Sequence, residues 1–248
     1  MRSLRPSRLS TSGTSRFDWR KAGMLAAIVV PVILLWSTPI VWPLKILVVF
    51  FHELSHGLAA ILTGGSLERI EVVAQQGGVC WTTGGSRFIV LSAGYLGSLL
   101  WGSGVLLAAS STTRDHRVAV GLGAVILGAT LAWVRPVLSF GFGFHVAAGL
   151  GLIACGWFLA DAVCDLVLKV FGVTSCLYVI PDIWSDTIAR SHLRSDARML
   201  AEATHIPTVI WGGLWIVAAL VVCGGLVWRT CRRSEAESLP APLLGGRP

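Results

Sequence analysis

The stretch "FFHELSHGLAAILTGG", Phe50–Gly65, decides the fold of this chain. It is apolar almost throughout, yet it carries two histidines and a glutamate. Together with the apolar residues that precede it, from Ile46, it approaches the roughly 20 residues that a helix needs to cross a bilayer. The stretch therefore predicts a membrane helix with three side chains that are costly to bury in lipid.

The composition of the whole chain also indicates a membrane protein. Its mean hydropathy is +0.73, and 13% of its 248 residues are charged, about half the share that is typical of a soluble domain. Because the apolar segments follow one another closely, we expect a single membrane-embedded domain, residues 22–230. A disordered basic tail, residues 1–21, precedes it, and a disordered tail, residues 231–248, follows it.

Basic residues gather at the two ends of the apolar region. They are Arg2, Arg5, Arg8, Arg16, Arg20, Lys21, Arg229, Arg232 and Arg233. Since Lys and Arg next to a span mark its cytoplasmic side, we predict a multi-pass protein of the cell (plasma) membrane with both termini cytoplasmic. A basic tail beside a span is a topology signal, which argues against nucleic-acid binding.

Helix breakers divide the apolar region into spans. We expect them at residues 24–42, 46–63, 88–109, 118–134 and 206–228. Residues 137–180 hold either two spans or one span and a partly inserted helix. Residues 66–85, "SLERIEVVAQQGGVCWTTGG", are too polar and short to cross, and their β-branched residues and glycines predict a β-hairpin. The predicted fold is an all-α polytopic membrane protein with six or seven transmembrane or re-entrant helices and a small hairpin after the second span.

Residues 52–56, His-Glu-Leu-Ser-His, form an HExxH pattern. On a helix the two histidines share one face, so both can bind one metal ion with Glu53 beside them as general base. Zinc accepts imidazole nitrogen and carboxylate oxygen, and a catalytic zinc keeps three protein ligands and one open position. His52 lies about 10 Å along the second span, a depth at which Glu53 needs a compensating partner. We therefore predict zinc, bound by His52 and His56.

A third metal ligand must come from elsewhere in the chain. The spacing of Asp and His residues leaves five candidates open, namely His145, Asp161, Asp165, Asp182 and Asp186. The aspartates form two pairs spaced i, i+4, and the histidine is isolated in an apolar stretch. An alternative role for Asp182 is that of a helix N-cap after Pro181, because Asp is a favoured cap.

Several segments together resemble a known family. The stretches "FFHELSHGLAAILTGGSLERIEV", "GGVCWTTGG" and "LSAGYLGS" are similar to the site-2 protease class of intramembrane zinc metallopeptidases, and within it to the B-type, metallopeptidase-like branch. "GVTSCLYVIPDIWSDTI" and "SDARMLAE" resemble a later segment of that branch, so the resemblance covers roughly residues 45–215.

The resemblance implies roles for individual residues. His52 and His56 would be zinc ligands and Glu53 the catalytic base. The class takes its third ligand from an Asp in a later membrane segment, and the matching stretch here is "PDIWSD". This makes Asp182 the first choice and Asp186 the second, although neither is followed by the Gly found in better-known members.

The predicted function is that of an intramembrane zinc metalloprotease, which cleaves a peptide bond in or near a span of another membrane protein within the lipid bilayer. We hypothesise that the hairpin captures unwound substrate by strand addition, so that Pro at Val72 or Val79 would cut cleavage; the alternative is a plain connecting loop. Two other functions remain open: a proteolytically silent metal-binding scaffold and a divalent-metal transporter.

Overall fold

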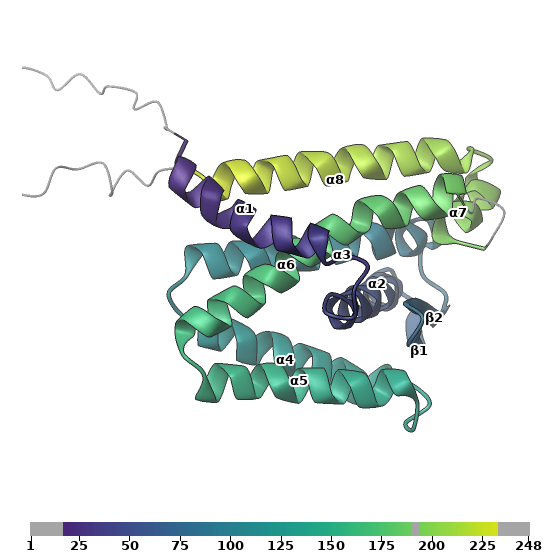
Figure 1. Cartoon of the computed structure of the whole chain (residues 1–248). Helices are drawn as coiled ribbons and strands as arrows, with labels where there is room; N and C mark the ends of the chain where they lie inside the picture. The colour runs from purple at the N-terminus through teal and green to yellow at the C-terminus, as the bar shows by residue number, and fades with distance from the viewer. Residues whose placement is uncertain (1–16, 190–193, 233–248) are drawn as a thin grey trace, which may run out of the picture.

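The structure is a computed structural model that describes residues 17–189 and 194–232. It is helical apart from one hairpin (Figure 1), which confirms the predicted fold class. The helices are α1 (Trp19–Leu34), α2 (Trp42–Leu62), α3 (Arg87–Ser111), α4 (Asp115–Trp133), α5 (Phe140–Phe158), α6 (Asp161–Trp184), α7 (Asp196–Thr204) and α8 (Thr208–Thr230). A π-helical turn, η1 (Ser185–Ala189), continues α6, and strands β1 (Ser66–Val73) and β2 (Gly77–Thr83) form the hairpin.

Six helices in the described part of the chain are long and apolar enough to cross a membrane: α2, α3, α4, α5, α6 with η1, and α8. The region 137–180 therefore holds two spans, one of the two arrangements that the sequence left open. Large apolar side chains cover the outer faces of these helices, and Leu100, Trp157 and Leu220 are each more than half exposed. A surface of this kind is solvated by lipid, whereas in water it would drive association.

The first predicted span, residues 24–42, differs from the structure. Helix α1 has 16 residues and ends at Leu34, so it reaches about 24 Å, which is less than the roughly 30 Å of the hydrocarbon core. The chain then turns, and the N–H and hydroxyl groups of Thr38 both donate to the carbonyl of Leu35. The apolar stretch that looked like one span is thus a short helix followed by turns.

Helix α2 lies at the centre of the protein. Figure 1 shows it nearly end-on whereas α3, α6 and α8 lie lengthwise, so it crosses the bundle at a steep angle. Most of its residues are buried, and Phe50 and Phe51 have no exposed surface. The helix that carries the HExxH pattern is therefore surrounded mainly by protein.

The hairpin predicted for residues 66–85 is present and packs against α2. Its strands are antiparallel, with Ile70 opposite Cys80 and Val72 opposite Gly78. The outer edge of β1 is occupied by the α4–α5 connection, because the N–H of Arg135 donates to the carbonyl of Ile70 over 3.0 Å. In the described structure the sheet has two strands, so β2 forms its other edge.

The two ends of the described chain lie side by side (Figure 1). The N–H of Asp18 donates to the carbonyl of Cys231 over 2.7 Å, and Phe17 pairs with Arg232. Both ends therefore leave the bundle on the same side. Most of the predicted tails, residues 1–21 and 231–248, lies outside the described residues.

Candidate metal centre

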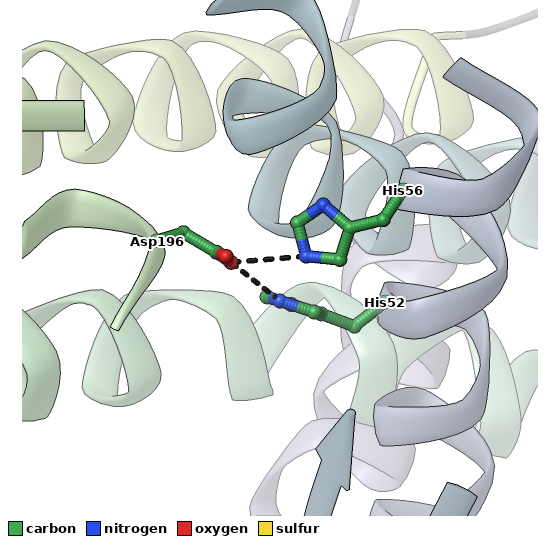
Figure 2. Close-up of side chains that lie close together, drawn as sticks. All are labelled: His52, His56 and Asp196. Carbon is green, nitrogen blue, oxygen red and sulfur yellow. Dashed lines mark hydrogen bonds and ion pairs between the residues drawn. The ribbon is translucent and has the colours of Figure 1, made fainter. Parts of the chain in front are cut away.

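The two histidines of the HExxH pattern converge on one carboxylate. His52 and His56 lie one turn apart on α2, and Figure 2 shows both rings turned toward Asp196. The Nε2 atom of His52 lies 2.9 Å from Oδ2 of Asp196, and that of His56 lies 3.0 Å from the same oxygen. Three potential ligand atoms from two distant parts of the chain thus meet at one point.

The donor set fits zinc. One ligand atom from each of His52, His56 and Asp196 lies within 4.8 Å of the other two, and within the described ranges this is the one group of three or more such residues with that geometry. Zinc binds imidazole nitrogen and carboxylate oxygen at about 2.0–2.2 Å in a tetrahedron, whose corners are about 3.4 Å apart. Two imidazoles and one carboxylate leave the fourth corner for a water molecule or a substrate.

Asp196 is brought to the histidines by the short helix α7. It is the first residue of that helix, and the side chain of Ser195 caps the helix by accepting a hydrogen bond from the N–H of Arg198. Ala197 and Leu200 on the same helix are fully buried and fix α7 against the bundle. Burial alone would raise the pKa of the Asp196 carboxyl, but the adjacent imidazoles of His56 and His52 hold that pKa below its usual range.

His56 is oriented by a second hydrogen bond. Its Nδ1–H donates to the backbone carbonyl of Val90 in α3 over 2.6 Å. This bond selects the tautomer whose Nε2 carries a lone pair, which is the form that binds a metal ion. Helix α3 also comes close at Gly94, where a Cβ atom would overlap the Nε2 atoms of both His52 and His56.

Glu53 lies beside the histidines and faces the hairpin. Its side chain is 7% exposed, and its carboxylate rests against Gly78 of β2. Cys80, two residues further along the same face of β2, is half-buried, and burial together with the nearby charge of Glu53 raises the pKa of its thiol. The Cys80 side chain is therefore a neutral neighbour of this site.

The other predicted ligand candidates lie outside this group of three. Asp186 accepts a hydrogen bond from the hydroxyl of Tyr95 over 2.6 Å, and neither Asp186 nor Asp182 belongs to the group around the histidines. Asp161 and Asp165 make ion pairs with His116 and Lys169, respectively. His145 is buried, with its Nδ1–H donating to the carbonyl of Gly141. The structure thus assembles the two predicted histidines with an aspartate that was not predicted.

A known protein family matches most of this chain. The family model described as Peptidase M50B-like matches residues 25–226, most of the chain. The chain belongs to the Peptidase M50B-like family. This membership places it among the intramembrane metallopeptidases, and it confirms the family resemblance seen in the sequence. No curated protein and no solved structure matches the chain.

The part of the chain that matches the Peptidase M50B-like family contains all four residues of the centre, His52, Glu53, His56 and Asp196. Asp196 is absent from the ligands predicted from the sequence because it lies outside the apolar runs. A local signal does exist: a serine and an aspartate open a short helix whose alanine and leucine, at positions 197 and 200, lie on one face. Such a face must pack against the bundle, and it carries the aspartate inward.

Proposed function

We propose that this protein is an intramembrane zinc metalloprotease that hydrolyses peptide bonds in or near the spans of other membrane proteins. The observation that carries the proposal is the convergence of His52, His56 and Asp196 beside a buried Glu53, inside a bundle of apolar helices. Membership of a metallopeptidase family gives independent support. A buried carboxylate next to three metal-binding side chains is costly for a merely structural membrane protein.

Asp196 is proposed as the third zinc ligand in place of Asp182 and Asp186. Its Oδ2 atom is within 3.0 Å of both Nε2 atoms, whereas the carboxylate of Asp186 is engaged by Tyr95. Zinc content of the purified protein tests this assignment. We expect about one zinc per chain in the wild type and in Asp182→Ala, and strong loss in His56→Ala and Asp196→Ala. Full zinc in Asp196→Ala with loss in Asp182→Ala would reverse the assignment.

Glu53 is proposed as the general base. A zinc ion at this centre would lower the pKa of water to about 7 and polarise the scissile carbonyl. A carboxylate oxygen of Glu53 accepts a proton from the attacking water and later delivers it to the leaving amine nitrogen. Burial of the Glu53 side chain between its own helix and the hairpin limits the access of other water to the carboxylate, so that its proton transfers are directed to the substrate.

The hairpin is proposed to hold the substrate as an added strand. A peptide bond in a membrane helix is protected by its own hydrogen bonds, so the substrate must unwind before it can be cleaved. An unwound segment needs new partners for its backbone, and the edge of β2 supplies them. This edge runs past Glu53 at Gly78, so a strand added there would lie close to the general base.

The proposed location is the plasma membrane, with both termini on the cytoplasmic side. The support is the set of basic residues at both ends of the chain, together with the adjacency of Asp18 and Cys231. Labelling of a single cysteine introduced near each terminus, in intact and in permeabilised cells, tests this topology. Labelling of either terminus in intact cells would contradict it.

A further inference from the structure

Tyr95 links the candidate metal centre to the end of α6. The residue lies on α3 next to Gly94 and has no exposed surface. Its ring meets the ring of His52 edge to face, with centroids 4.9 Å apart and an interplanar angle of 86°. At its far end the hydroxyl donates to Oδ2 of Asp186 over 2.6 Å. Tyr95 therefore contacts a predicted metal ligand with its ring and a half-buried acceptor with its hydroxyl.

The two histidines are held by different means. His56 is fixed by a hydrogen bond from its Nδ1 to the carbonyl of Val90. The ring of His52 lies between two other rings, since it packs edge to face against both His56 and Tyr95, at 4.8 Å and 4.9 Å. An aromatic edge limits the rotation of a ring without competing for its nitrogen atoms. Tyr95 is thus placed to define the orientation of His52.

Tyr95 is itself fixed from two sides. The ring of Trp215 in α8 packs against it at 4.9 Å, and Asp186 holds its hydroxyl. Asp186 belongs to the π-helical turn η1, and such turns change the direction of side chains relative to a regular α-helix. The same turn packs against α8, where a Cβ on Gly212 would come within 2.5 Å of Thr187. This turn therefore delivers the Asp186 carboxylate to a fixed place.

We propose that Tyr95 and Asp186 are positioning residues of the metal centre. Asp186 accepts a hydrogen bond from the hydroxyl of Tyr95, and the Tyr95 ring holds the imidazole of His52 with its Nε2 atom toward Asp196. The inference rests on the proposed function, because it takes His52 as a metal ligand. It gives Asp186 a different role from the one predicted from the sequence. A ligand oriented before the metal arrives loses less conformational freedom on binding, so the pair raises metal affinity.

Cobalt(II) titration of the full-length apoprotein in detergent tests the inference. Cobalt takes the place of zinc, and its visible absorption reports affinity and ligand geometry without any need for a substrate. We expect Tyr95→Phe and Asp186→Ala each to weaken cobalt binding about 10-fold, as is typical for residues that orient metal ligands. The double variant should be no weaker than the single variants, because both remove the same interaction.

Matched controls separate positioning from general damage. Tyr178→Phe removes the hydroxyl of the other tyrosine in the chain, which packs near Trp36, and Asp165→Ala removes a carboxylate paired with Lys169. Both should bind cobalt as the wild type does. Asp186→Asn keeps an oxygen that can accept from Tyr95, so it should retain affinity within about threefold of the wild type. If Tyr95→Phe does not fold, Asp186→Ala and Asp186→Asn still form a complete comparison.

The outcomes distinguish this inference from the proposed function. Wild-type affinity and absorption spectrum in both Tyr95→Phe and Asp186→Ala, with binding lost in His56→Ala, would overturn the positioning role alone. Equal weakening in Asp186→Asn and Asp186→Ala would also overturn it, since the charge and not the hydrogen bond would then matter. A wild-type protein that binds neither cobalt nor zinc would overturn the proposed function as well.

Discussion

Gly78 of β2 lies so close to Glu53 that a Cβ atom at this position would be 2.5 Å from Oε1 of the glutamate. The hairpin therefore sets the place of the proposed general base. We expect Gly78→Ala to displace the carboxylate and to lower cleavage about 10- to 100-fold, because misplacement of a catalytic group by about 1 Å can cost that much. Zinc content should be unchanged, because the metal ligands are not touched.

The neighbouring glycine supplies the control for this prediction. A Cβ atom at Gly77 would come no closer than 3.2 Å, to a methyl group of Val73. Gly77→Ala should therefore retain most of the activity. Cleavage assays of the two variants on the same membrane-protein substrate decide the matter, and equal activity of the two would show that Gly78 does not position Glu53.

Gly94 should control metal binding. A side chain at this position would overlap the Nε2 atoms of His52 and His56, so Gly94→Ala must push at least one imidazole away. We expect zinc affinity to fall at least 10-fold, a loss similar to that caused by removing a residue that orients a ligand. Gly104→Ala on the same helix is the control, because a Cβ atom there meets no atom within 4 Å. Competition with a coloured chelator measures both affinities.

The free edge of the hairpin can be identified from one hydrogen bond. The carbonyl of Ile70 points away from β2, since it accepts from Arg135. In an antiparallel pair of strands, the backbone N–H and C=O groups of two directly opposite residues either all point toward the partner strand or all point away from it. Cys80 lies opposite Ile70, so its backbone N–H points to the open edge of β2. By the same alternation, the backbone N–H and C=O groups of Glu71 and its partner Val79 point toward each other and join the two strands.

Strand addition is therefore best tested at Cys80. Cys80→Pro removes one outward N–H, and an edge strand tolerates Pro at such a position. We expect it to lower substrate affinity, whereas Cys80→Ala should not. Val79→Pro, suggested by the sequence, would instead break the pairing of β1 with β2. Unchanged KM in Cys80→Pro, with zinc retained, would favour a plain connecting loop.

Helices α4 and α5 should depend on a close contact between glycines. A Cβ atom at Gly123 would lie 2.6 Å from the carbonyl oxygen of Gly149, so Gly123→Ala must force the helices apart. Overpacking of this kind costs about 1–3 kcal/mol. Gly128→Ala in the same helix meets open space and should leave stability unchanged or slightly higher. Thermal unfolding in detergent compares the two variants.

The sequence predicts the elements of this fold better than it predicts the completed site. The apolar run around His52 and the glycines that end it define α2, and the alternation after them defines the hairpin. The predicted length of the first span is wrong, because hydropathy alone does not distinguish an apolar helix from the apolar turns around Thr38. Those turns are stabilised by local hydrogen bonds to Leu35, and hydropathy does not record such bonds.

The third ligand required tertiary information. Asp182 and Asp186 have the spacing of two ligands on one face of an α-helix. The π-helical turn that begins at Ser185 changes the direction of the Asp186 side chain, which accepts a hydrogen bond from Tyr95 instead. Asp196 lies in a polar stretch outside the apolar runs, and its approach to α2 depends on how α7 packs through Leu200. Periodicity reports a face within one helix, whereas the contact between α7 and α2 joins residues far apart in the chain.

The central claim, that Glu53 acts on a peptide bond at this metal centre, is tested most directly by the Glu53→Gln variant. Membrane-protein fragments are compared by mass spectrometry between cells that express the wild type and cells that express the variant at the same level. We expect the variant to keep its zinc, since Glu53 is not a ligand, and to lose the fragments that the wild type produces. The same fragments from both proteins would contradict the claim and favour a metal-binding scaffold.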